Sequence, residues 1–407
     1  MDAKLQTATL NRDAGAWDEG NTVSGEPVRG GPAAPLWLGS FAIGTEMFVT
    51  AGLLGRIAGD FGITVGFAGL TVTVAAVAYA AGAPLLGAAL GNQSPRRVLI
   101  GSLLVFGLSA LASTVAPTMA VLLVSRVLGG LAASVYGPAA AATAVGAQTA
   151  QRRGRALGVL QAASSVAMLA GAPVGLLLAA TVSWRAAFGM VAVVATIALL
   201  GLQRSSVGSA PTTPATVRDR FRPLRSAAVV GPLAGTVLLM AASNSMYSYL
   251  GVLVGGIAET VGHWALLAAF GIGGVLGTWY GGAAADRWGG ARVALIAGTM
   301  LTAGLAALPL VAAFPAAAIA VLVCWGFAGW GFVPGQQHRL IGLGSGSAPI
   351  LLALNGSAIQ LGFAVGAMLG GLVVDTAGAG DLWILAVGCG AAGIALHGLI
   401  LPRAVRP

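Results

Sequence analysis

Two charged side chains stand inside apolar stretches that are long enough to cross a membrane. Glu46 lies within FAIGTEMFVTAGLLG, residues 41–55, and Arg126 lies within an apolar run over 118–142. A charge at the centre of a bilayer costs about 2.5 kcal/mol or more. A desolvated carboxylate can bind and release a proton, and a nearby arginine opposes that binding. The pair therefore predicts either proton exchange or a static ion pair that fixes the packing of two helices.

The composition makes lipid the solvent for most of the chain. Of its 407 residues, 57% are hydrophobic and 8% are charged, and the mean hydropathy is +0.89. Soluble proteins carry about 25% charged residues, so no soluble fold of this length could bury so much apolar surface. The sequence has no Walker A, HExxH or GxSxG motif with its partners, and its histidines share no metal-site spacing. We therefore expect no enzyme, no cofactor and no metal site.

Apolar runs between polar or Pro/Gly breaks predict the membrane helices, since a bilayer core about 30 Å thick needs roughly 20 residues per span. They predict twelve spans, at 36–58, 67–90, 97–115, 118–142, 156–181, 185–203, 228–254, 264–284, 292–312, 315–334, 348–374 and 382–401. The stretch PGQQHR, 334–339, is interpreted as a loop. The predicted fold class is an all-α membrane protein with twelve transmembrane helices.

A polar linker divides these spans into two sets of six. We expect an N-terminal bundle over 36–203, a cytoplasmic linker over 204–227 and a C-terminal bundle over 228–401. Residues 1–35 are polar and lack an apolar leader, so they are interpreted as a disordered cytosolic tail, and 402–407 as a second tail.

The basic residues predict the orientation. With the N-terminus inside, 18 of the 21 Lys and Arg residues fall in tails or cytoplasmic loops. This asymmetry follows the positive-inside rule and places both termini in the cytoplasm. It also explains the net charge of +9 through orientation and the inner leaflet, so nucleic acid is not expected as a partner.

Two small-residue patterns recur at one offset. GAALGNQSPRR starts at Gly87 and GAAADRWGGAR at Gly282, while GAPVG starts at Gly171 and GAMLG at Gly366; both offsets are 195. Two independent patterns at one offset indicate that the halves are structural repeats. Such repeats in transporters surround a site near the membrane midplane that opens alternately to each side.

Several stretches resemble motifs of the major facilitator superfamily. GAAADRWGGAR resembles its loop signature, RVLGGLAAS its span-4 motif and GAPVGLLL its antiporter motif. SWRAAF is similar to the corner between spans 5 and 6 of bacterial drug and sugar exporters. GTEMFVTAGLLGRIAGDFGIT resembles span 1 of the 12-span drug:proton antiporter branch, near bacterial chloramphenicol-resistance and arabinose-efflux proteins. The resemblance covers nearly all of residues 36–401 and implies two pseudo-symmetric six-helix bundles.

The resemblance assigns conformational roles to residues of the two loops and of span 5. These residues are Gly87, Arg96, Gly171, Pro173, Gly175, Gly282, Asp286, Arg287, Gly289 and Arg292. Gly282 would allow close helix contact, and Asp286 would bind a neighbouring helix N-terminus or an arginine in one state. The plainer alternative is a solvated turn. Gly91 stands where the family has Asp in the first-half loop, which weakens the lock in that half.

The span-5 motif has its own two interpretations. Gly171, Pro173 and Gly175 would bend the helix and form a tight, dry contact between the bundles, or they are ordinary Gly/Ala packing. Ala172 stands before Pro173 where the family often has Gly, which makes the antiporter assignment less secure.

Glu46 and Arg126 are expected at similar depths. Glu46 lies about 15 Å from the cytoplasmic end of its span, and Arg126 about 12 Å from the outer end of its own. In the resembled architecture both spans line the central cavity, where pairing or exchange of partners would follow. Glu46 could also contact a cationic substrate. Its equivalent at the 195-residue offset is Ala241, so proton coupling is expected in the first half.

Uncharged polar residues are the remaining cavity candidates. Asn244, Tyr247 and Tyr249 in span 7 and Gln360 in span 11 could hydrogen-bond a substrate or join helices.

The function predicted first is a secondary transporter of the bacterial inner (cytoplasmic) membrane, which exports a small organic compound or drug in exchange for protons. Its expected partners are the substrate, protons and lipid, and it is expected to be monomeric. Alternatives are export of a sugar or purine nucleoside, a proton-coupled importer, and a membrane enzyme or sensor.

Overall fold

A computed structural model gives the fold of most of the chain. It describes residues 33–146, 148, 152–205, 216–254, 262–311, 313–343 and 348–399. In these ranges every regular element is a helix. The first helix begins at Ala33 and the last ends at Leu399, so the two predicted tails lie almost wholly outside the described residues.

Ten elements make up the first half. They are α1 (Ala33–Gly52), α2 (Leu54–Phe61), α3 (Val65–Ala68), α4 (Leu70–Ala89), α5 (Pro95–Thr114), α6 (Met119–Gly146), α7 (Arg153–Val166), the π-helix η2 (Ala167–Gly171), α8 (Ala172–Thr181) and α9 (Trp184–Arg204). Polar residues fix several starts. For example, the Ser94 hydroxyl accepts from the Arg97 N–H, and Pro95 occupies the first helical position.

The second half follows a short linker and has a similar order. Its elements are α10 (Val217–Phe221), η3 (Arg222–Arg225), α11 (Ala227–Tyr247), α12 (Leu250–Leu253), α14 (His263–Trp288), α15 (Gly290–Val311), α16 (Pro315–Gly342), α17 (Ala348–Thr376), η4 (Ala379–Asp381) and α18 (Leu382–Leu399). We call the end of the bundle where α1 begins the inner end, and the opposite end the outer end, after the predicted orientation.

Membrane-spanning helices account for nearly the whole described chain. Eleven are long and apolar enough to cross a bilayer, and α1 with α2 makes a twelfth if the bent pair is one span. The twelve spans predicted from the sequence therefore match the helices of the structure.

Spans 1 and 5 are interrupted near the cavity. The axes of α1 and α2 differ by 64° at Leu53, directly after Gly52. The Thr50 hydroxyl donates to the Glu46 carbonyl at 2.6 Å, which is a side-chain bond that favours helix bending. In span 5 the π-turn η2 precedes Pro173, whose missing N–H interrupts the helical ladder.

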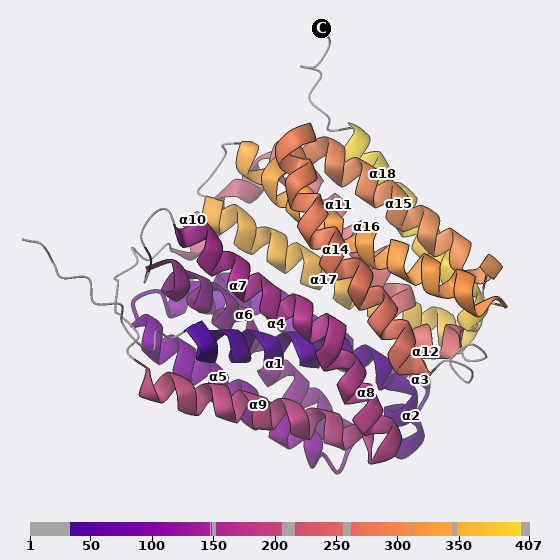
Figure 1. Ribbon diagram of the computed structural model, residues 1–407, viewed down its shortest axis with the longest axis horizontal. Coiled ribbons are helices and arrows are strands. Elements are labelled where there is room, and N and C mark those ends of the chain that lie inside the picture. Colours follow the sequence, from indigo (N-terminus) through magenta and orange to yellow (C-terminus); the bar gives the residue numbers. More distant parts are fainter. Residues whose placement is uncertain are drawn as a thin grey trace, which may run out of the picture. The chain divides into compact units, whose positions relative to one another are not determined.

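The contacts between the two halves follow the repeat. Helix α4 packs on α17, while η2 and α8 pack on α14 (Figure 1). The 195-residue offset relates α4 to α14 and α8 to α17, so it converts one interface into the other. The repeat found in the sequence therefore corresponds to a pseudo-two-fold arrangement of the helices.

The linker is more structured than the sequence suggested. Residues 206–215 lie outside the described chain, but 217–225 form α10 and η3. In α10 the Thr216 hydroxyl donates to Asp219 and holds the pKa of that carboxyl below its ordinary value. Arg220 donates to the Gly87 carbonyl at 2.9 Å, so the linker is bound to the inner end of α4.

The interpretation of PGQQHR as a loop was wrong. Helix α16 continues through Pro334 to Gly342, and both Gln336 and Arg339 are buried in it. Arg339 therefore belongs to a span and not to a loop. Proline is tolerated inside membrane helices that pack closely on their neighbours. The Gln336 amide donates to the Pro232 carbonyl, which ties this part of α16 to α11.

Candidate functional site

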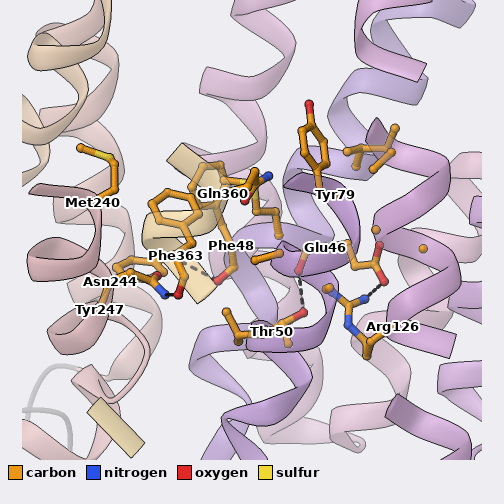
Figure 2. Close-up of a pocket in the computed structure, with 18 of the residues that line it drawn as sticks. Glu46, Phe48, Thr50, Tyr79, Arg126, Met240, Asn244, Tyr247, Gln360 and Phe363 are labelled. Atoms are coloured by element: carbon orange, nitrogen blue, oxygen red, sulfur yellow. Dashed lines mark hydrogen bonds and ion pairs between the residues drawn. The ribbon is translucent and has the colours of Figure 1, made fainter. Parts of the chain in front are cut away.

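A cavity lies between the two halves at about the middle of the helices. It is lined mainly from α1, α4, α6, α11, α16 and α17. Its wall is mostly apolar, with a few polar groups, which is the usual character of a small-molecule site. Both Glu46 and Arg126 line it (Figure 2).

Glu46 and Arg126 form an ion pair through Glu46 Oε1 and a terminal nitrogen of Arg126. The side chains are 4% and 5% exposed, so the pair is almost fully withdrawn from water. Removing one partner of such a pair costs about 3–5 kcal/mol because the other charge is left uncompensated. The two residues that the sequence placed at one depth are therefore in contact. Their part in proton coupling stays a prediction.

The surroundings of the pair hold the arginine from several helices. Arg126 Nε lies 3.5 Å from the Thr71 carbonyl of α4, and its guanidinium lies 5.5 Å from the centre of the Phe188 ring of α9. A Cβ at Gly129 would lie 2.9 Å from Ser109 Oγ of α5, and one at Gly130 would overlap the backbone of α4. The glycines of the span-4 motif thus give α5 and α4 room to approach α6.

Three of the four predicted polar residues line the cavity. Asn244 donates to the Phe363 carbonyl at 2.7 Å, Tyr247 donates to the Phe48 carbonyl at 3.3 Å, and Gln360 lies 3.6 Å from the Met47 sulfur. Tyr247 and Gln360 therefore reach from the second half to α1 of the first. The polar contacts of these three side chains join different helices, and each side chain also lines the cavity.

Tyr249 is not among the residues that line this cavity. It is buried nearer the outer end, where its hydroxyl donates to the Ala367 carbonyl at 2.7 Å. The residues Gly69 and Gly371 flank this hydroxyl, since a Cβ on either would meet it. The tyrosine is an interhelical contact, which was the alternative interpretation of these polar residues.

An aromatic cluster that the sequence did not predict lines the cavity. Phe48, Tyr247, Phe270 and Trp330 all line the cavity, and Trp325 packs behind them. Ring centroids are 4.9 Å apart for Tyr247 and Phe270 and 5.6 Å apart for Phe48 and Trp330. These residues come from four helices in both halves, so their meeting depends on tertiary structure and has no sequence signal of its own.

The span-5 glycines make a different contact from the one expected. A Cβ at Gly171 would meet Thr45 Oγ1, and one at Gly175 would lie 2.6 Å from Val49, so both glycines face α1 of the same half. The contact with the other half is made by other residues of this span; for example, a Cβ on Gly271 of α14 would lie 2.9 Å from the backbone of Leu169, two residues before Gly171. Residues of η2 and α8 other than Gly171 and Gly175 therefore face α14.

The charged residues of the second-half loop motif are exposed. Asp286 is exposed, and within the described residues it has no hydrogen-bond or ion-pair partner. A Cβ added at Gly282 would meet no atom within 4 Å. The close helix contact is instead at Gly281, where a Cβ would lie 2.6 Å from the Gly331 carbonyl. Gly289 ends α14 with φ of 85°, a conformation that favours glycine. Arg287 and Arg292 are exposed.

The first-half loop makes two recorded contacts. Gly87 accepts the bond from Arg220, and a Cβ there would lie 2.9 Å from that guanidinium. Arg96 donates to the Gln203 carbonyl near the end of α9 at 2.8 Å. Both arginines thus meet carbonyls at helix C-termini, where positive charge is favoured.

A polar contact joins the halves at the outer end. Asp375, on the last turn of α17, accepts from the Thr64 hydroxyl at 2.6 Å and from the Gly66 N–H at 3.0 Å. A Cβ at Gly66 would overlap the Gly371 carbonyl, so the two backbones touch. The three residues carry no motif, and their approach across about 310 positions of sequence was not foreseen.

Comparison with known proteins agrees with this architecture. The sequence pattern of the family described as Major Facilitator Superfamily matches residues 36–344. The chain is 30% identical to the chloramphenicol resistance protein of Streptomyces lividans, over 86% of this chain and 92% of that protein. It is 29% identical to the inner membrane transport protein YdhP of Escherichia coli K12, over 90% and 94% of the two chains.

A solved structure shares the fold. The crystal structure of a D-xylose-proton symporter is similar with a TM-score of 0.73 at 16% identity, covering 91% of this chain and 97% of that one. The family match, the twelve-span helical fold and the cavity between two repeats agree with one another. The chain belongs to the Major Facilitator Superfamily and is a multi-pass membrane transporter, not an enzyme.

Proposed function

We propose that the protein exports a small, partly apolar organic compound in exchange for protons. The observation that carries this proposal is the Glu46–Arg126 pair, which is buried and also lines the cavity between the halves. A carboxylate in this position can take a proton when its arginine partner moves, and can release the proton when the pair re-forms. Similarity to a chloramphenicol resistance protein supports an organic compound as the substrate.

The cavity wall supports a substrate with both a ring and hydrogen-bonding groups. Phe48, Tyr247, Phe270 and Trp330 offer aromatic surfaces on one side. Asn244 and Gln360 offer amides from the second half, and Glu46 lines the cavity from α1 of the first half. Because the carboxylate is already neutralised by Arg126, an uncharged molecule would enter without leaving a new unpaired charge.

The conformation supports alternating access. At the outer end the halves meet through Asp375 with Thr64 and Gly66, and the aromatic cluster lies between that end and Glu46. At the inner end Asp286 has no hydrogen-bond or ion-pair partner among the residues that the structure describes. We infer that this is a state closed to the outside, and that the Asp286 lock forms in the opposite state.

We also propose the orientation and organisation that the sequence predicted. Both termini face the cytoplasm of a bacterium, the six-helix halves span 36–203 and 228–401, and one chain is the functional unit. The inner end then faces the cytoplasm, where a substrate for export would enter.

The experiment uses a bacterium that lacks its own major drug pumps. Cells that express the protein, or the same protein with Glu46→Gln, are loaded with a panel of compounds that includes chloramphenicol, and intracellular accumulation is measured with and without a protonophore. We expect cells that express the protein to accumulate less of a transported compound than control cells. The protonophore should raise their accumulation back to the control level. If no compound is depleted, or if depletion survives the protonophore, proton-driven export is contradicted. Higher accumulation than in control cells would indicate import.

A further inference from the structure

A second buried polar cluster lies in the second half, away from the cavity. It consists of His397 on α18, Gln336 on α16, Thr236 on α11 and Asn355 on α17. Each of these side chains is at most 1% exposed, and none lines the central cavity. The proposed transport step does not use them, and His397 is a titratable group buried within one turn of the inner end of its helix.

The hydrogen bonds fix the orientation of the Gln336 amide. Its Nε2 lies 2.7 Å from the Pro232 carbonyl and 2.9 Å from Thr236 Oγ1. A peptide carbonyl only accepts hydrogen bonds, so the amide atom that faces it must be the nitrogen. The other amide atom, Oε1, is therefore the one that faces His397.

The imidazole of His397 consequently faces two acceptors. Nδ1 lies 3.0 Å from the Gly393 carbonyl, and Nε2 lies 3.2 Å from Gln336 Oε1. A neutral imidazole has one N–H and would turn a lone pair toward one of these oxygens. The imidazolium has two N–H groups and satisfies both. Gly235 completes the site, because a Cβ there would overlap the ring.

We propose that His397 is a proton-binding site of the second half, held as the imidazolium by the Gly393 carbonyl and Gln336 Oε1 in the conformation seen here. The proton ties α18 to α16. The site loses its proton when α16 and α18 move apart, because only the complete pair of acceptors supports a buried positive charge.

The charges around the imidazole make the protonation of His397 depend on its two hydrogen bonds. The ring is buried, and Arg339 lies one turn after Gln336 on α16, so both burial and a nearby positive charge oppose the imidazolium. The other titratable residues of these helices are Cys324 and His338 on α16, Cys389 on α18, the exposed Arg292 at the start of α15, and Tyr247 and Asp375 at the outer ends of α11 and α17. In the described chain none of these pairs with the ring, so no carboxylate compensates it. The two hydrogen bonds alone oppose the repulsion.

The chain offers a clean spectroscopic test, because it has three histidines. In a His263→Asn, His338→Asn background, nitrogen-15-labelled histidine reports on His397 alone, in detergent or nanodiscs and without a substrate. At about pH 7, where a free imidazole is mostly neutral, we expect both ring nitrogens to give protonated signals. Gln336→Met keeps the volume, removes the acceptor and should give a neutral tautomer at the same pH.

Two further variants keep the result interpretable if Gln336→Met folds poorly. Gln336→Glu places a carboxylate at the same atom and should keep the imidazolium to higher pH than the parent. Glu46→Gln should leave the His397 signals unchanged, which separates this proposal from the proposed transport mechanism. A neutral His397 in the parent protein at about pH 6 would overturn the proposal. An imidazolium that is unaffected by both Gln336 variants would overturn it as well.

Discussion

The two halves of the protein share their packing and differ in their buried polar groups. Gly171 in the first half and Gly366 in the second, 195 residues apart, both let span 5 or its equivalent lie against the first helix of its half. Glu46 pairs with Arg126 beside the cavity, whereas its equivalent, Ala241, is an apolar contact. The repeat thus conserves close backbone contacts, while the side chains that face the cavity set the chemistry of each half.

The largest effect is expected from Glu46→Gln. This change keeps the shape and removes the titratable group, so proton-driven export should fall to the level of cells without the protein. Transport down a substrate gradient should persist, because the cavity is retained. Drug accumulation in cells and flux into proteoliposomes measure the two activities.

An acid of the same span supplies the matched control for that change. Asp60 lies at the outer end and pairs with Arg185 at 2.5 Å, with the two side chains 41% and 31% exposed. Asp60→Asn should leave proton-driven export within about twofold of the parent, since exposed pairs contribute about 1 kcal/mol or less. Equal losses in both variants would mean that Glu46 has no special role.

A large loss of stability is expected from Arg126→Met. It leaves Glu46 buried without its partner, at a cost of about 3–5 kcal/mol. The double variant Glu46→Gln, Arg126→Met should regain most of this loss, because no uncompensated charge remains. Thermal unfolding in detergent measures it. Arg185→Met, which opens the exposed pair, should cost about 1 kcal/mol or less.

Smaller losses of stability are expected from Gly→Ala changes, and they should differ between equivalent positions of the two halves. Gly366→Ala brings a Cβ to 2.5 Å from the Ala241 carbonyl, which is backbone and cannot move aside, so we expect a loss of about 1–3 kcal/mol. Gly171→Ala meets the Thr45 hydroxyl, which can rotate, and should cost less. Gly282→Ala meets no atom within 4 Å and should be neutral or slightly stabilising. Equal losses at Gly171 and Gly366 would contradict this difference.

The smallest effect is expected at the outer contact. Asp375→Asn weakens the bonds to Thr64 and Gly66 by about 1 kcal/mol or less, which changes the ratio of states about fivefold or less. A cysteine in place of the fully buried Ala68, in a variant without Cys324 and Cys389, should then react faster with an outside thiol reagent. Unchanged labelling would remove Asp375 from the gate.

Span positions and the ion pair could be predicted because their signals are local. Each span is a long apolar run, and the depth of Glu46 or Arg126 follows from counting residues along a helix. The repeat could be predicted as well, since small residues at one offset survive in the sequence.

The remaining features depend on contacts between distant segments. Gln336 and Arg339 followed a proline and so suggested a loop, but both are buried within α16, and Gln336 bonds to α11 and α18. Tyr249 resembled Tyr247 in sequence, yet the end of α11 at Tyr247 turns it toward α17 and away from the cavity. Asp375 carried no motif at all, and its partners lie in the other half.

The central claim is that Glu46 exchanges a proton instead of remaining permanently paired with Arg126. Infrared titration of the purified transporter tests this directly and needs no substrate. The difference between the parent and Glu46→Gln should contain the carbonyl stretch of a protonated carboxylic acid, which grows as the pH is lowered and is absent from the variant. Identical spectra for the two proteins at every pH at which both stay folded would show that Glu46 is a static partner of Arg126.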